Sequence, residues 1–344
     1  MNASLVFTVD TEPDDQWAPP LADGSLPPFA FSNTRGLSRL KDFFSRFDAP
    51  ATWMTSYSVA RDPESARVLR SAAESGDEIA GHLHGWETPP YIAVDRTARP
   101  FIAEYEPDVR LAKHRSLLEA HQDAFGAHPI SYRAGRWGVD ALELQHLAKL
   151  GYRIDSSIAP GIDFRDRYGL RIPGPDFRAY LNSNGPRPYR DGPLWQVPAS
   201  ILPIGLLGGG AFSAAVARYA GRRNPGSDVP RSISNSLAKL RLQRVVWIRP
   251  LRHPREQMVQ ATHELLRRGC PIVNVMFHSS EAFLGTSPLS RNQEDVERLY
   301  GDLEAIIQAA RECGATPRTL REAVAAISLD TNSPASQPAP QSPE

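Results

Sequence analysis

The sequence predicts one α/β domain built around a parallel sheet or barrel, and two observations support this fold class. Short apolar runs rich in β-branched and aromatic residues alternate with longer segments of helical periodicity along most of the chain. Several of these runs lead directly into polar residues, as happens where parallel strands end at a functional rim. A length of 344 residues is ample for a substantial core, but length alone does not decide between one domain and two.

The first half of the chain shows the alternation most clearly. The strands expected there are Ser4 to Val9, Ala51 to Thr55, Glu78 to His84, Ile130 to Arg133 and Tyr152 to Asp155. The helices expected between them are Thr34 to Phe47, Pro63 to Ser75, Asp108 to Phe125 and Asp140 to Leu150. Gly76 and Gly151 follow two of these helices, at the position where glycine commonly ends a helix.

The same pattern returns in the second half of the chain. We expect strands at Leu194 to Val197 and Ile272 to Phe277, and helices at Pro254 to Arg268 and Asn292 to Cys313. A last helix is expected after Thr319, which has Glu322 at the spacing of a capping box.

The domain is expected to span residues 1–329 and to contain an irregular insertion at about residues 161–235. This stretch is rich in Gly, Pro, Arg and Asn and has an apolar patch at Ile201 to Phe212. Long irregular segments inside compact domains are usually functional or flexible, so we expect the insertion to face the substrate. The tail at residues 330–344 is rich in Pro and Ser and is expected to be disordered.

Composition excludes several classes of protein. Lys plus Arg and Asp plus Glu number 39 each, and no basic cluster favours nucleic acid or an anionic membrane surface. No apolar run approaches the roughly 20 residues of a membrane span. The amino terminus has no basic region and becomes acidic by Asp10, which predicts a core strand and a cytoplasmic protein. Cys270 and Cys313 are too few for a disulfide framework, and we expect both to be buried thiols.

The first strand leads into a group of carboxylates in the segment VFTVDTEPDD. Asp10 and Glu12 are two positions apart, so in an extended chain they project to the same side. Like charges held together are costly unless a cation is present, so the pair indicates a metal or acid–base site. A solvated acidic loop, continued by Asp14 and Asp15, is the alternative interpretation.

A second strand end carries His82 and His84 in the segment EIAGHLHGWE. Their spacing places both imidazoles on one face, and two histidines with one carboxylate leave coordination positions open for water or substrate. A structural role for either histidine is the alternative. We expect Trp86 to form a wall of the same site.

Three further strand ends contribute polar groups. Arg133 and Arg136 lie near Trp137 in SYRAGRWG, and a guanidinium beside the acidic pair would keep a carboxylate ionised and aimed. Asp155 ends the strand in GYRIDSSIAP. His278 emerges from PIVNVMFHSSE, where a general acid would be wanted, and a nearby aspartate could orient it.

Taken in order, these five segments resemble the five motifs of the polysaccharide deacetylases, the NodB-homology group also called carbohydrate esterase family 4. The similarity extends from about Leu5 to Ile327. It implies a distorted (β/α)7 barrel and removal of acetyl groups from carbohydrate with a bound divalent metal, commonly zinc. The matching roles are the catalytic base for Asp10, metal ligands for Glu12 and His82, the arginine supporting the base for Arg133, the partner aspartate for Asp155 and the general acid for His278.

Two motifs depart from the family pattern. Thr11 separates Asp10 from Glu12, where the family usually has adjacent aspartates. The family's histidines are separated by three residues, whereas His82 and His84 are separated by one. The second metal histidine is expected to be His84, with Asp14 or Asp15 as substitutes.

The expected function is therefore metal-dependent deacetylation, most readily N-deacetylation, of an acetylated carbohydrate. Trp86, Arg136 and Trp137 are expected to contact the substrate, and Trp195 offers a further flat face. One alternative is a non-haem iron oxygenase, which uses the same ligand types but would be expected on an all-β scaffold. The other is a catalytically inactive metal- or carbohydrate-binding protein on the same fold.

Overall fold

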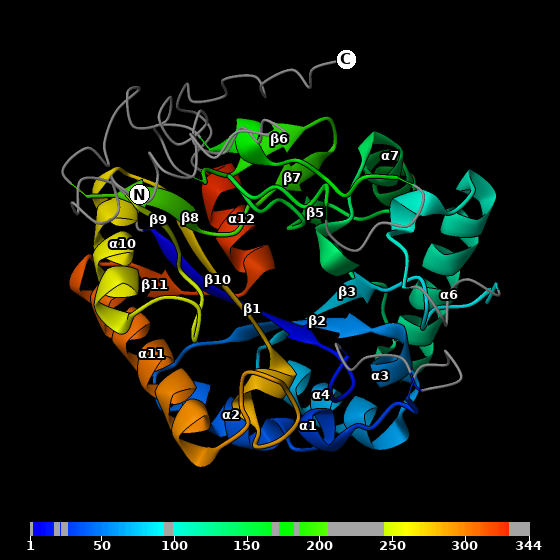
Figure 1. Ribbon diagram of the computed structural model, residues 1–344, viewed down its shortest axis with the longest axis horizontal. Helices are drawn as coiled ribbons and strands as arrows, with labels where there is room; N and C mark the ends of the chain where they lie inside the picture. The colour runs from blue at the N-terminus through cyan, green and yellow to red at the C-terminus, as the bar shows by residue number, and fades with distance from the viewer. Residues whose placement is uncertain are drawn as a thin grey trace.

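The chain folds into a curled parallel sheet with helices packed around it (Figure 1). The computed structural model describes residues 3–16, 21, 27–92, 99–166, 172–181, 186–205 and 244–329. Within these residues seven strands run parallel in the order β10, β1, β2, β3, β4, β5, β7, and β6 adds to β7 in the antiparallel sense. The α/β class and the distorted barrel predicted from the sequence are confirmed.

The strands follow the apolar runs of the sequence closely. They are β1 (Ser4–Thr11), β2 (Ala51–Ser56), β3 (Glu78–Leu83), β4 (Ser131–Ala134), β5 (Ile154–Asp155), β6 (Tyr189–Asp191), β7 (Leu194–Gln196), β8 (Ile201–Ile204), β9 (Arg244–Trp247), β10 (Ile272–His278) and β11 (Thr316–Pro317). Strands β8 and β9 form a separate antiparallel pair.

Helices connect most of the parallel strands, as the alternation predicts. The α-helices are α1 (Ser32–Arg35), α2 (Leu37–Ser45), α3 (Tyr57–Arg61), α4 (Pro63–Glu74), α6 (Pro107–Phe125), α7 (Ala141–Lys149), α10 (Arg255–Arg267), α11 (Gln293–Glu312) and α12 (Leu320–Leu329). Short 3-10 turns are η1 (Ile102–Glu104), η2 (Gly135–Trp137), η3 (Arg178–Tyr180) and η4 (Ser279–Ala282). No helix in the described residues is long and apolar enough to cross a membrane.

Side-chain hydrogen bonds and a backbone bond, rather than a continuous backbone ladder, join the two ends of the described parallel run. The buried Asn274 of β10 donates through Nδ2 to the carbonyls of Val197 and Pro198, each at 3.2 Å, just after β7. Its own carbonyl accepts from the backbone N–H of Ser200 at 3.1 Å. The sheet therefore curls into a barrel that is distorted at this seam.

Helix α12 covers the end of the barrel opposite the carboxyl ends of the strands. The N–H groups of Leu320 and Arg321 donate to Thr52 Oγ1 and Glu78 Oε2, each at 2.8 Å, at the start of β2 and β3. The expected capping box is present, because Thr319 N donates to Glu322 Oε2 at 2.9 Å and Glu322 N to Thr319 Oγ1 at 3.3 Å. Apolar residues of α12 pack among inward residues of β1, β2 and β3, so polar groups gather at the other end.

Two details, at Gly36 and at Cys313, differ from the sequence predictions. The single helix expected at Thr34 to Phe47 is two helices that meet at Gly36, where an added Cβ would lie 3.0 Å from the Phe283 ring. Cys313 is exposed at the end of α11, whereas Cys270 is buried, which raises the pKa of its thiol to about 11.

The described part of the insertion expected at residues 161–235 is less irregular than predicted. Besides the expected strand at β7, it contributes β6 to the main sheet and β8 to the antiparallel pair. Residues 206–235 and the expected disordered tail at residues 330–344 lie outside the described residues.

Candidate functional site

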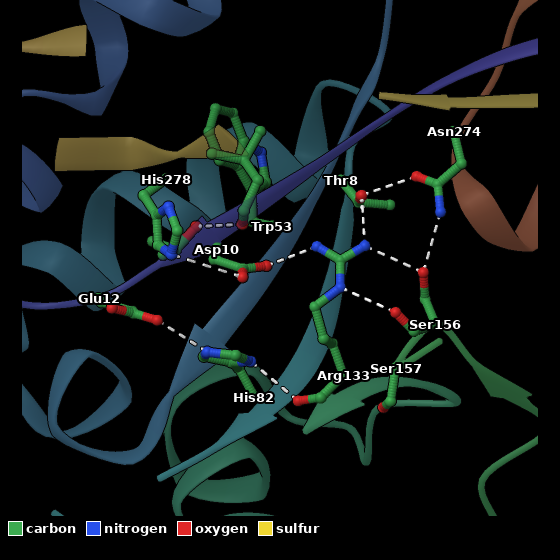
Figure 2. A network of polar contacts seen from close by, with 12 residues as sticks. Thr8, Asp10, Glu12, Trp53, His82, Arg133, Ser156, Ser157, Asn274 and His278 are labelled. Carbon is green, nitrogen blue, oxygen red and sulfur yellow. Dashed lines mark hydrogen bonds and ion pairs between the residues drawn. The ribbon is translucent and has the colours of Figure 1, made fainter. Parts of the chain in front are cut away.

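The two-residue period of β1 determines which side chains enter the barrel. Its alternate apolar residues pack outward against the helices, which leaves Asp10 on the inner side at the carboxyl end. The sheet register pairs Asp10 with His278 of β10, and His82 of β3 with Arg133 of β4. These side chains and Glu12 converge at one rim of the barrel, as Figure 2 shows.

Glu12, His82 and His84 converge on one point. Glu12 Oε1 lies 2.8 Å from Nε2 of each histidine, and the two Nε2 atoms are 3.0 Å apart. His82 Nδ1 lies 2.8 Å from the carbonyl oxygen of Arg133. Because a carbonyl only accepts hydrogen bonds, the proton of a neutral His82 resides on Nδ1 and the lone pair of Nε2 faces the convergence point.

This donor set fits a divalent cation. The three ligand atoms lie within 4.8 Å of one another and all three residues are buried. Two imidazole nitrogens and one carboxylate oxygen that meet at buried positions form a donor set of the kind that suits zinc or ferrous iron. Asp10, Glu12 and His278 form a second group that meets the same distance limit.

The charge state of the three residues agrees with a metal site. Burial opposes ionisation of Glu12, but His84 and the hydrogen bonds from both histidines outweigh it and hold the pKa of Glu12 well below its ordinary value. Burial lowers the pKa of His84 to about 4 despite Glu12. The pKa of His82 is raised, because Asp10 and Glu12 outweigh its burial. A cation would replace the proton that these carboxylates otherwise favour on His82.

Asp10 is held by Arg133, as the sequence predicts. The guanidinium donates from Nη1 to Asp10 Oδ1 at 2.6 Å, and its other nitrogens donate to Thr8 Oγ1 and to the hydroxyl and carbonyl oxygens of Ser156. Arg133 is fully buried, so its position is determined by these four bonds. The second oxygen of Asp10 is thereby turned toward His278, with Oδ2 lying 3.9 Å from Nε2.

His278 takes its partner from its own strand end and not from Asp155. Its Nδ1 lies 3.1 Å from Glu281 Oε1, and the same oxygen accepts a hydrogen bond from Arg249 Nη2 at 2.6 Å. Arg249 Nη2 also lies 3.0 Å from His278 Nδ1. Burial works against ionisation of Glu281, but Arg249 and His278 outweigh it and lower the pKa of Glu281 to about 2. With Glu281 as the acceptor for Nδ1, Nε2 of His278 faces the site.

Asp155 lies away from this pair, which corrects the orienting role expected for it. Asp155 Oδ1 accepts from the Ser157 hydroxyl, and its Oδ2 has no hydrogen-bond partner among the described residues. Burial raises the pKa of Asp155 to about 7. The reason is positional: Ile154 packs inside the barrel and Ser156 bonds inward to Arg133 and Asn274, so the alternation of the chain turns the side chain of Asp155, which lies between them, away from the cavity.

Asp14 and Asp15 do not join the metal-type cluster. Asp14 accepts from the backbone N–H groups of Ser32 and Asn33, each at 2.9 Å, and so secures the start of α1. Asp15 is anchored by its backbone, which donates to Thr286 O at 2.8 Å. His84 is therefore the third member of the cluster, as preferred from the sequence.

A cavity of about 570 Å³ opens above these residues. Trp86, Arg136 and Trp137 line it, as expected from the sequence, together with Asp10 and His278. Trp195 does not line the cavity and instead packs in the core among residues of β1 and α12. Substrate contact by the three expected residues remains a prediction.

The site also contains three residues to which the sequence analysis gave no role: Trp247, Arg249 and Glu281. The signal for the first two was the apolar run VVWI leading into Arg249, which has the same strand-end pattern as the other motifs. Glu281 stands in the motif that supplies His278, at a spacing of three residues that a 3-10 turn brings together.

The comparisons with known proteins agree with this architecture. No family model matches the chain. It is 27% identical over 129 residues to a peptidoglycan deacetylase of Helicobacter pylori, and the match spans 37% of this chain and 39% of that protein. A solved structure from Mycobacterium smegmatis, assigned to the polysaccharide deacetylases, superposes with a TM-score of 0.50 at 15% identity and covers 99% of this chain and 96% of that one. The chain thus shares the fold of that solved structure, which confirms the sequence resemblance at the level of the fold.

Proposed function

We propose that this protein is a metal-dependent hydrolase that removes an acetyl group from an amide on a carbohydrate. The observation that carries the proposal is the meeting of Asp10, His278 and a metal-type donor set at the floor of one cavity. The shared fold and the partial match to a peptidoglycan deacetylase support the reaction class.

Glu12, His82 and His84 would hold the metal, for which we propose zinc. A bound divalent metal polarises the acetyl carbonyl and makes water more acidic. Asp10, held in place by Arg133, accepts a proton from a water molecule while the oxygen of that water attacks the acetyl carbon. The aromatic side chains that line the cavity shield this step from bulk water.

His278 completes the reaction as general acid. With Nδ1 held by Glu281, its Nε2–H points to the side of the site where Asp10 lies. It donates this proton to the amide nitrogen as the carbon–nitrogen bond breaks, which releases acetate and a free amine. The base and the acid therefore stand on the neighbouring strands β1 and β10.

The test combines metal analysis with acetate release. We expect the purified protein to hold one equivalent of divalent metal and to release acetate from N-acetylglucosamine oligomers. Asp10→Asn should retain the metal and lose turnover by about 10²–10⁴-fold, because it removes the base but no member of the Glu12–His82–His84 set. His82→Ala should lose both metal and turnover.

Two results would contradict the proposal. If the protein takes up no metal after reconstitution, the Glu12–His82–His84 set is not a metal site and the proposed mechanism fails. A protein that holds metal but releases no acetate from any acetylated sugar, with Asp10→Asn indistinguishable from wild type in ligand binding, is a metal- or carbohydrate-binding protein on this fold.

A further inference from the structure

The charge of the cavity points to a feature of the substrate beyond its acetyl group. Among the described residues that line it, the arginines are Arg136, Arg249 and Arg252, and the carboxylates are Asp10 and Glu12. A divalent metal bound at Glu12 would add two more positive charges. The buried Glu281, 2.6 Å from Arg249, balances that arginine, and Arg136 and Arg252 offset Asp10 and Glu12. With the metal, the loaded cavity therefore carries a net positive charge, although the whole chain has equal numbers of basic and acidic residues.

Arg136 is built into the cavity wall. The backbone φ angles of Arg136 and Trp137 are 56° and 62°, a left-handed conformation that residues other than glycine rarely adopt. The turn begins at Gly135, where an added Cβ would lie 2.3 Å from Nδ1 of His84. The Arg136 guanidinium lies 4.8 Å from the Trp86 ring centre, so the arginine is held beside the metal-type donor set.

Arg252 reaches the same cavity from a second anchored loop. Leu251, the residue before it, has a φ angle of 64°. The buried Asp302 of α11 holds this loop, because it accepts from Leu251 N at 3.2 Å and from Arg255 Nε at 3.0 Å. Arg252 itself is exposed, which places its charge at the mouth of the cavity.

We propose that the site selects acetylated sugars that carry an anionic group, a carboxylate or a phosphate, on or beside the acetylated ring. This inference rests on the proposed function. Arg136 and Arg252 are the selecting residues, because a guanidinium binds carboxylate and phosphate oxygens in pairs and stays charged at any working pH. The cavity volume of about 570 Å³ is in the usual range for small-molecule sites, so one or two sugar rings fit beside the arginines.

The test compares neutral and anionic substrates with the metal-loaded full chain. Di-N-acetylchitobiose is the neutral probe, N-acetylmuramic acid carries a carboxylate, and N-acetylglucosamine 1-phosphate carries a phosphate. We expect kcat/KM for at least one anionic probe to exceed that for the neutral probe by about tenfold or more, and to fall as salt rises. The anionic probe with the larger increase in kcat/KM shows whether the site prefers a carboxylate or a phosphate.

Variants assign the selection to the two arginines. Arg136→Gln and Arg252→Gln should each lower the ratio of anionic to neutral kcat/KM by about tenfold, the loss of one charge-assisted contact. Arg61→Gln, an exposed residue of α3 paired with Asp123, should leave the ratio unchanged. Metal content reports whether each variant has folded. Equal kcat/KM for all probes, or an unchanged ratio in both variants, would overturn the inference.

Binding measurements separate this inference from the proposed function. Calorimetry with metal-loaded Asp10→Asn gives the dissociation constants of the same three probes without turnover. Tighter binding of an anionic probe, lost in Arg136→Gln, would uphold the inference even if wild type released no acetate from any probe. Acetate release without any preference for charge, in binding or in turnover, would uphold the function and reject the inference.

Discussion

Asp10 and His278 have buried partners of different charge, and this difference supports the proposed roles of base for Asp10 and acid for His278. Arg133 lies behind Asp10 and donates to it, which leaves the carboxylate as an acceptor facing the cavity. Glu281 lies behind His278 and accepts from Nδ1, which turns Nε2 toward the cavity. In the proposed mechanism a base and an acid therefore face each other across 3.9 Å, each fixed by a buried charged partner.

Replacing Glu281 by Gln tests the positioning of the acid. The amide keeps the shape of the side chain but removes the charge that stabilises a proton on His278, so we expect kcat to fall about 10- to 100-fold, the worth of a charge-assisted hydrogen bond. KM and metal content should change little, because Glu281 is not in the Glu12–His82–His84 set. Glu297→Gln on the exposed face of α11 is the matched control. An unchanged kcat would show that Arg249 alone positions His278.

Asp155 gives a pH-dependent prediction. Its pKa is raised to about 7 by burial, whereas an unfolded chain would titrate near about 3.9. The folded state thus retains a proton that the unfolded state has lost, so wild type loses stability as pH rises from about 4 to 7. Asp155→Asn removes this titration, and its unfolding free energy should exceed that of wild type by an amount that grows over this range, on the order of 3 kcal/mol.

Urea denaturation at pH 5 and pH 8 measures the difference for Asp155→Asn. Asp123→Asn, at an exposed position on α6, should show no comparable gain at the higher pH. If the difference between wild type and Asp155→Asn is the same at both pH values, Asp155 is ionised in the folded protein.

At the scale of single residues, the sequence predicts where a side chain lies on the barrel better than it predicts the hydrogen-bond partner of that side chain. The strand-end pattern places Asp10, His82 and His278 at one rim because parallel strands share a direction. Which carboxylate meets His278 depends instead on strand order and on the turn after β10, and neither can be read from spacing. The sequence prediction therefore gave this role to Asp155 and none to Glu281, whereas in the fold the partner of His278 is Glu281.

At the scale of elements, helix α6 determines the shape of the loop after β3. Lys113 of α6 is fully buried, and its ammonium group donates to the carbonyls of Gly85 and Thr88 at 2.8 Å and of Pro90 at 2.7 Å. This loop carries Trp86 into the cavity directly after the histidine pair. A single cation thus connects a peripheral helix with the wall of the site.

Lys113→Met should loosen that loop. The thioether fills similar space but leaves two buried carbonyls, of Gly85 and Thr88, without this donor, so we expect the unfolding free energy to fall by roughly 2–4 kcal/mol. KM should rise as well, because Trp86 loses its fixed position. Lys149→Met, at the exposed end of α7, is the control and should change neither quantity appreciably. Wild-type stability in Lys113→Met would mean that water or neighbouring groups replace the ammonium.

Elements were predictable where local signals agree with packing. The capping pair Thr319 and Glu322 correctly predicted the start of α12. Gly76, which follows α4, has a φ angle of 96°, which is typical of a glycine at a helix end. Strand β9 was not predicted, because its four residues follow a stretch without periodicity and pair only with β8. Its strand character comes from that partner, which the local sequence does not contain.

At the scale of the whole molecule, the site depends on strands distant in sequence. Glu12 follows the first strand, His82 ends the third, and His278 ends a strand near the carboxyl end of the chain. The seam at Asn274 brings β10 close to the residues after β7. The donor set therefore exists only when the barrel is assembled, and its ligands are scattered in the unfolded chain.

Metal binding should consequently stabilise the entire fold. A cation that binds only the folded state adds about 2.7 kcal/mol to the unfolding free energy when its free concentration is 100 times its dissociation constant. We expect Tm to fall after chelation and to recover with zinc, and the recovery should be absent in His82→Ala. His263→Ala, at the surface of α10, should keep the full shift because His263 bonds only to Glu312 among described side chains. An equal shift in both variants would place the stabilising ion outside the Glu12–His82–His84 cluster, since only one variant removes a ligand from it.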